Sequence, residues 1–143
     1  MSENTKVKKY HLPLSELIDR LTILEIKLVL DPISAPSYLD ELSRIKNDIE
    51  IELEEKNYSL DLKTIQILIT LGQMNLHIWY IKDTMKTQLE DKSSYANNMK
   101  LAHQLNGLRN QLKNSLLGLD SDANASSVRT NVDMDGLFID LGI

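Results

Sequence analysis

The sequence predicts an all-α fold, a four-helix up-and-down bundle with a long central third helix and an extended C-terminal arm. Apolar residues recur at spacings of three and four along four segments, which places them on one face of a helix. Glycine and proline are scarce, at five and three of 143 residues, which argues against a turn-rich β protein. Aromatic residues make up only 5%, so the core must consist mainly of leucine and isoleucine, which suits helices packed on helices.

The chain divides into three regions. We expect a polar lead-in over residues 1–12, a helical bundle domain over residues 13–118, and a linker with a C-terminal arm over residues 119–143. The length is that of one ordinary domain, and 42% hydrophobic content is enough for a core. The expected helices span about 13–31, 37–56, 60–89 and 93–117, with Ser93 or Ser94 as the cap of the fourth.

The first helix carries an acidic residue on its apolar side. Its stripe contains Leu14, Ile18, Leu21 and Leu28, and Glu25 projects to within about 20° of Leu14, in the middle of that stripe. An ionised carboxylate there must find a cation and donors, become neutral or reach solvent. We expect Glu25 to lie inside the protein, where the first, third and fourth helices meet.

The third helix is apolar on two faces. Its second face carries Ile65, Ile69, Leu76 and Tyr80, and a helix of this kind is usually buried between neighbours or packed in an oligomer. Gly72 lies inside the helix and costs about 1 kcal/mol against alanine, which predicts close packing or a bend there.

The C-terminal region contains an alternating apolar pattern. Its members, Leu137, Ile139, Leu141 and Ile143, are typical of a short strand or extended arm, docked on its own bundle or reaching a second subunit. The preceding residues 131–136 match the first half of a calcium loop, but Gly142 stands where a bidentate carboxylate is required. An Asp-Gly turn is the better interpretation.

The sequence lacks the usual motifs of catalysis and of cofactor binding. It has no cysteine, its three histidines lack metal-ligand spacing, and it has neither a glycine-rich phosphate loop nor a nucleophile elbow. We therefore expect no catalytic residues, no metal and no cofactor. Glu52 and Glu55 have the spacing of a magnesium-binding pair in all-α nucleotide hydrolases, which keeps a metal-dependent hydrolase as an alternative.

Charge and hydropathy restrict the partners. The formal net charge of −5 gives no global field for a nucleic acid polymer. No apolar run approaches the length of a membrane span, and the N-terminus lacks the apolar core of a signal peptide. The expectation is a cytoplasmic protein without a nucleic acid or membrane partner.

Polar residues border the apolar stripes of the third and fourth helices. Lys82 and Arg109 are the cations that we expect to pair with Glu25. One interpretation is a structural network that fixes helix register. The other is a ligand pocket, in which cations bind an anion, an aromatic ring stacks and amides orient the ligand. The predicted ligand-binding residues are Glu25, Asn75, Trp79, Lys82, Asn106, Arg109 and Lys113.

The segment SELIDRLTILEIK resembles the opening signature of an uncharacterised bacterial and phage family, Glu-Leu-(Ile/Val)-Asp-(Lys/Arg)-Leu-(Thr/Ser)-Ile-Leu-Glu-Ile-Lys. Later helices of that family carry Asn, an aliphatic-Trp pair and Glu-Asp, and then Asn and Arg. The matching positions here are Asn75, Ile78-Trp79, Lys82-Asp83, Asn106 and Arg109. Lys82 replaces an acidic residue of that pattern, and the C-terminal arm has no counterpart in it. The resemblance implies a helical fold and a polar cluster that includes Glu25, and it points toward a nucleotide or nucleotide-sugar ligand.

The leading functional hypothesis is a non-enzymatic helical binding protein, a homo-oligomer that holds a small anionic ligand such as a nucleotide. A phage version could sequester a signalling nucleotide of the host as a counter-defence. The second hypothesis is a structural or adaptor protein that acts through contacts of its helices and C-terminal arm with protein.

Overall fold

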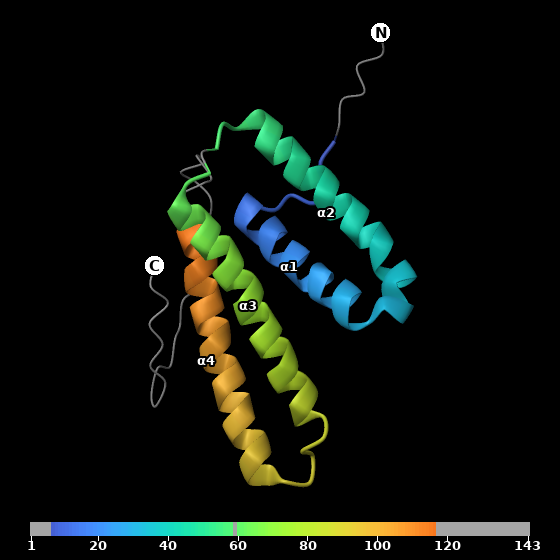
Figure 1. Ribbon diagram of the computed structural model, residues 1–143, viewed down its shortest axis with the longest axis vertical. Helices are drawn as coiled ribbons and strands as arrows, with labels where there is room; N and C mark the ends of the chain where they lie inside the picture. Colours follow the sequence, from blue (N-terminus) through green and yellow to red (C-terminus); the bar gives the residue numbers. More distant parts are fainter. Residues whose placement is uncertain (1–6, 59, 117–143) are drawn as a thin grey trace.

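The computed structural model describes residues 7–58 and 60–116 of the chain. They form α1 (Leu14–Leu30), the short 3-10 helix η1 (Pro32–Ser34), α2 (Ala35–Glu55), α3 (Leu62–Met85) and α4 (Lys92–Leu116) (Figure 1). These described residues contain four α-helices and no strand, which confirms the predicted all-α fold. The predicted C-terminal arm and the calcium-like motif lie outside the described residues.

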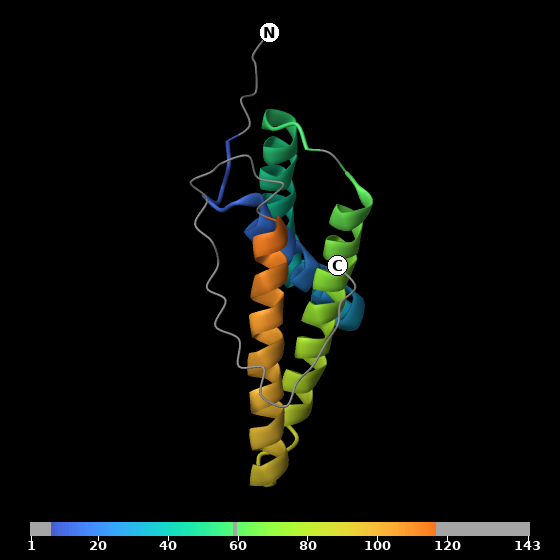
Figure 2. The same cartoon turned by 90° about the vertical axis from the view of Figure 1, so that its left-hand side faces the viewer.

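The helices form two antiparallel pairs, α1 with α2 and α3 with α4 (Figures 1 and 2). α1 packs against α2 on one side and against α3 and α4 on the other. No Cα atom of α2 lies within 8 Å of one in α3 or α4. The helix at the centre of the packing is therefore α1. The two longest helices are α3, with 24 residues, and α4, with 25 residues.

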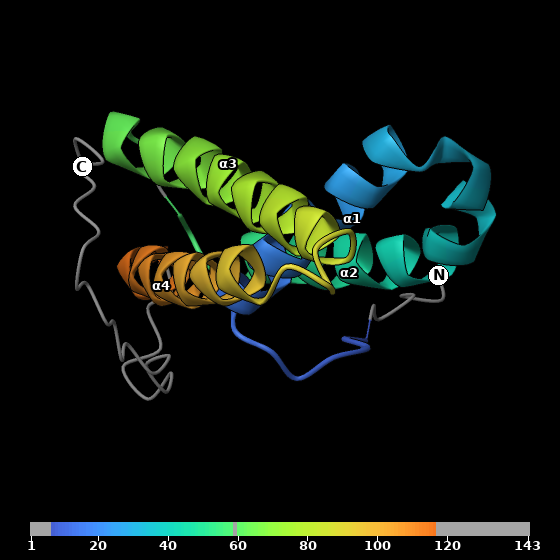
Figure 3. The same cartoon turned by 90° about the horizontal axis from the view of Figure 1, so that it is seen from below.

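Two hydrophobic cores hold the pairs together. Seen from below, the α1/α2 pair lies beside the α3/α4 pair (Figure 3). The larger core lies between α3 and α4 and contains Ile67, Leu71, Ile78, Leu105, Leu108 and Leu112, among others. The smaller one lies between α1 and α2, around Leu17, Leu24 and Ile45. Ile18 of α1 packs against the larger core, so α1 contributes to both.

The helix boundaries follow local capping chemistry. Asp61 precedes α3, and its carboxylate accepts a hydrogen bond from the Thr64 backbone N–H at 2.8 Å. Asp91 does the same before α4, accepting from the Ser94 N–H at 3.2 Å. The predicted Ser93 or Ser94 cap is thus wrong by two or three residues, because a carboxylate just upstream supplies the acceptor.

Residues 7–12 fold back onto α2 through a buried carboxylate. Asp48 is fully buried and accepts hydrogen bonds from the backbone N–H groups of Lys9 (2.7 Å) and Tyr10 (2.6 Å). The Lys8 ammonium group contacts Glu52 at 2.5 Å. Burial by itself would raise the pKa of Asp48, but the two backbone hydrogen bonds, a hydrogen bond from Asn47 and the positive charge of Lys8 together hold the pKa below its ordinary value. The end of the predicted polar lead-in is therefore part of the packed structure.

The close packing predicted at Gly72 is absent among the described residues. A Cβ atom built at Gly72 meets no atom within 4 Å, so no described residue packs closely there. The second apolar face of α3 also stays open, since Ile69 is 60% exposed and Tyr80 is 52% exposed. The monomer by itself gives no reason for glycine at this position.

Candidate functional site

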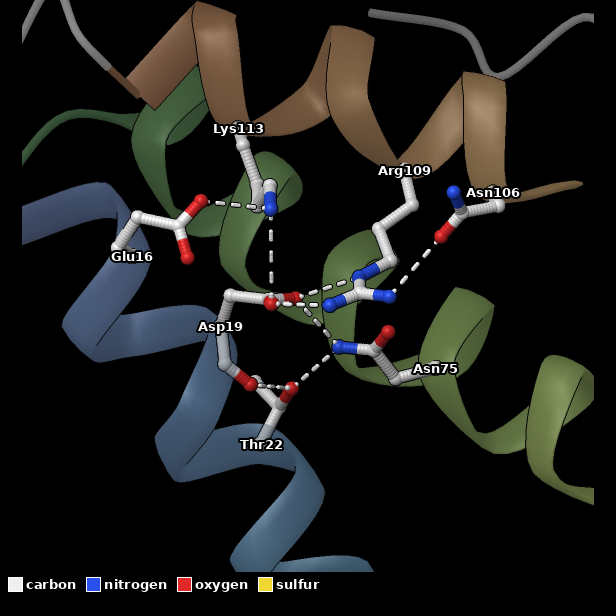
Figure 4. Close-up of polar contacts among 7 residues, drawn as sticks. All are labelled: Glu16, Asp19, Thr22, Asn75, Asn106, Arg109 and Lys113. Atoms are coloured by element: carbon white, nitrogen blue, oxygen red, sulfur yellow. Dashed lines mark hydrogen bonds and ion pairs between the residues drawn. The ribbon is translucent and has the colours of Figure 1, made fainter. Parts of the chain in front are cut away.

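The polar side chains between the helices converge on a carboxylate of α1, Asp19, which is 1% exposed (Figure 4). Arg109 of α4 binds it with two donors, Nε to Oδ1 at 2.9 Å and Nη2 to Oδ2 at 2.5 Å. Asn75 of α3 donates a third hydrogen bond to Oδ1 at 2.9 Å. Asp19 thus ties three helices together through a bidentate ion pair and an amide.

A second set of contacts surrounds this pair (Figure 4). The Asn75 amide also donates to the Thr22 hydroxyl at 2.6 Å, and that hydroxyl donates to the Asp19 backbone carbonyl at 2.7 Å. The Lys113 ammonium group binds Glu16 at 2.7 Å and lies 3.8 Å from Asp19 Oδ2. We call these residues the ionic cluster; its members are Glu16, Asp19, Thr22, Asn75, Asn106, Arg109 and Lys113.

The pKa values follow from this geometry. Burial alone would raise the pKa of Asp19, but the hydrogen bonds from Arg109 and Asn75 and the positive charges of Arg109 and Lys113 hold it below its ordinary value. Burial would lower the pKa of Arg109, whereas the hydrogen bonds and negative charge of Asp19 raise it. Both groups therefore stay ionised at neutral pH.

The ionic cluster balances its own charge. Two cations, Arg109 and Lys113, face two carboxylates, Asp19 and Glu16. The third nitrogen of the Arg109 guanidinium, Nη1, donates to the Asn106 side-chain oxygen at 3.0 Å. The arrangement fixes the register of α1 against α3 and α4, which matches the structural network that the sequence left open.

The structure brings together four of the seven predicted site residues: Asn75, Asn106, Arg109 and Lys113. Trp79 is half-buried and Lys82 is exposed, and within residues 7–58 and 60–116 neither makes a hydrogen bond or ion pair with the ionic cluster. Glu25 is exposed, so its predicted place in the interior, paired with Lys82 and Arg109, is wrong. Arg109 binds Asp19 instead.

The error at Glu25 has a geometric cause. α1 is contacted from two sides, and most of its buried residues form two arcs, with Leu17 and Leu24 toward α2 and with Ser15, Asp19 and Ile26 on another side. Glu25 lies between these arcs, about 100° from Leu24 and about 120° from Asp19. The stripe is packed at its first residues, since Leu14 is buried and Ile18 and Leu21 pack against the cores, but at Glu25 it borders a groove between α1 and α3.

Three members of the ionic cluster, Glu16, Asp19 and Thr22, were not predicted from the sequence, and Asp19 is the central one. The signal was a second stripe on the same helix, in which Ser15, Asp19, Thr22 and Ile26 follow spacings of four, three and four. Its small and polar members suit a helix that approaches two others closely and hydrogen bonds to them. The apolar stripe concealed it, because leucines dominate a pattern read for hydrophobicity alone.

A groove between α1 and α3 lies beside the ionic cluster. Its α1 wall is formed by Ile18, Leu21, Thr22, Glu25, Ile26, Val29 and Leu30, and its α3 wall by Leu68, Gly72, Gln73, Leu76 and Tyr80. It encloses about 500 Å³. Each wall runs over thirteen residues, from Ile18 to Leu30 and from Leu68 to Tyr80, which is about 18 Å along a helix. We call this feature the α1/α3 groove.

The α1/α3 groove is apolar and open to solvent. Val29 is 74% exposed, and Leu30 and Tyr80 at the same end are also exposed. Glu25 is the one charged residue in the lining, and it makes no hydrogen bond or ion pair within residues 7–58 and 60–116. A contiguous apolar surface of this kind is typical of an interaction site.

Other kinds of site find no support in the described part of the chain. It contains no group of three or more side chains suited to hold a metal ion. None of its helices is long and apolar enough to cross a membrane. Comparison with models of known families, with curated proteins and with solved structures returned no match. The family resemblance of the opening segment therefore stays a prediction.

Proposed function

We propose that this chain is a non-enzymatic interaction protein that binds an α-helix of another protein in the α1/α3 groove. The observation that carries the proposal is the open apolar lining of that groove, which no described residue covers. In this account the ionic cluster holds α1 in register, so that the two walls of the groove keep a fixed separation.

The shape of the groove favours a helix over a small molecule. Pockets for small ligands usually bury most of the ligand surface. This groove is long and open on one side, and a helix laid along it would contact both walls over about three turns. Grooves that bind amphipathic helices use the same combination of an apolar floor and exposed rims.

A small anionic ligand, the leading expectation from the sequence, receives less support. Two of the three cations predicted to bind it, Arg109 and Lys113, already bind Asp19 and Glu16, and the third, Lys82, is exposed outside the ionic cluster. Lys113 is also nearly buried, at 5% exposure. A nucleotide would have to displace a carboxylate from each. Calorimetry with a panel of nucleotides tests this candidate, and heat of binding that Arg109→Ala abolishes would restore it.

The metal-dependent hydrolase, the other alternative, also receives less support. Glu52 is engaged by Lys8 at 2.5 Å and by Lys56 at 3.3 Å. An acidic pair for magnesium has to leave its oxygens free for the ion.

The proposal is tested with a synthetic amphipathic helix of about 20 residues, a length that spans the groove. The peptide carries leucines at helical spacing, glutamines elsewhere, no net charge and a fluorescent label. We expect its anisotropy to rise with added protein, and Gly72→Leu to abolish the rise because a leucine fills the floor of the groove. The matched control is His103→Leu, which adds a leucine at an exposed position of α4 outside the groove, and this variant should bind the peptide normally. Absence of binding to the wild-type protein, or equal binding by Gly72→Leu, would contradict the proposal.

A further inference from the structure

We infer that the helix bound in the α1/α3 groove is basic and carries a lysine or arginine that pairs with Glu25. We also infer that this helix crosses α3 at Gly72, where it comes closest to the α3 backbone. The inference rests on the proposed function and specifies the partner's chemistry. Two independent features of the groove carry it: the isolated carboxylate on its α1 wall and the glycine on its α3 wall.

Glu25 defines the charge of the partner. It lies among apolar lining residues such as Leu21 and Val29 and has no ion-pair partner in the described chain. An occupant that covers the apolar lining also removes water from around this carboxylate, and an unpaired charge there would cost binding free energy. A cation on the edge of the incoming helix removes that cost. The chain's net charge of −5 favours the same sign of partner.

Gly72 defines where the partner comes closest. It lies inside α3, where glycine is unfavourable relative to alanine, and the space over its Cα is empty. Leu68 and Leu76 lie one turn before and after it on the same wall. A helix that crosses here can approach the backbone of α3 between these two leucines. A side chain at position 72 would hold it away.

The charge is tested with two versions of the labelled peptide that differ only at the positions flanking the leucine stripe, lysine in one and glutamate in the other. Wild-type protein should bind the lysine peptide more tightly. Glu25→Lys should reduce that preference about tenfold, because an attraction becomes a repulsion. Glu90→Lys makes the same change of net charge at an exposed site outside the groove and should alter the preference less than twofold.

The crossing point is tested with Gly72→Ala. The added methyl group meets no atom, so the variant should unfold at a Tm about 4 °C higher than the wild-type protein. Its affinity for the lysine peptide should nevertheless fall about tenfold. A more stable protein that binds less tightly cannot be explained by partial unfolding. Unchanged affinity would overturn the assignment of the crossing to Gly72.

Each failure has its own signature. If both peptides bind equally to wild-type and Glu25→Lys proteins, the basic partner is wrong and the helix-binding function stands. If no peptide binds, the proposed function fails as well. Sedimentation equilibrium of the full chain supplies the last outcome: a dimer that Gly72→Leu dissociates would identify a second copy as the occupant and overturn the inference.

Discussion

Two acidic residues on α1, Asp19 and Glu25, have opposite environments although they lie fewer than two turns apart. Asp19 is 1% exposed and is bound by Arg109 and Asn75. Glu25 is exposed on the wall of an apolar groove. The difference follows from their positions around the helix. Asp19 points toward α3 and α4, whereas Glu25 lies on the side of α1 that borders the α1/α3 groove.

Removing one partner of the buried pair should be costly. Arg109→Ala leaves the Asp19 carboxylate buried without its principal donor, and we expect the free energy of unfolding to fall by about 3–5 kcal/mol. Arg44→Ala is the matched control, because Arg44 pairs with Asp40 on the exposed surface of α2 and should contribute less than about 1 kcal/mol. Urea denaturation measures both. Equal effects of the two variants would show that the ionic cluster is not a brace.

The depressed pKa values of Asp19 and Asp48 predict acid sensitivity. A carboxyl group whose pKa is lower in the folded state stabilises the fold above its unfolded pKa, near 3.8, and loses that contribution as the pH falls through the folded pKa. Stability should therefore be level near neutrality and fall below about pH 4. Urea denaturation at a series of pH values between about 2.5 and 7 measures this dependence. A rise in stability on acidification would contradict it.

At the scale of single elements, apolar periodicity predicted the existence of all four helices and their boundaries to within a few residues. The periodicity reports which side of a helix is apolar. It does not report whether a core or a groove faces that side, which is why the prediction that Glu25 lies in the interior is wrong. Asp61 and Asp91 cap the first turns of α3 and α4, and an apolar pattern does not detect these carboxylates.

The segment before α1 offers an element-scale prediction. Asp48 accepts two backbone N–H groups, so Asp48→Ala leaves Lys9 and Tyr10 without their acceptor. We expect both amides to exchange with deuterium much faster in the variant, measured by NMR, while amides within α3 keep their protection. Asp40→Ala on the exposed side of α2 serves as control. Unchanged protection of Lys9 and Tyr10 would mean that other contacts hold this segment.

At the scale of the whole molecule, four amphipathic segments were enough to predict an all-helical, up-and-down arrangement. They could not predict that α2 packs against α1 but not against α3 or α4, because apolar periodicity does not specify which helices become neighbours. Residue types alone identified four members of the ionic cluster, but its central acceptor, Asp19, required the three-dimensional packing of α1.

The central claim is that the α1/α3 groove, and not the ionic cluster, is the binding surface. Hydrogen–deuterium exchange with and without the lysine peptide tests it most directly. We predict slower exchange in the segments that form the groove walls, residues 18–30 and 68–80, and little change over residues 100–113 of α4. Slower exchange confined to α4 around Arg109 and Lys113, with the groove walls unchanged, would contradict the account.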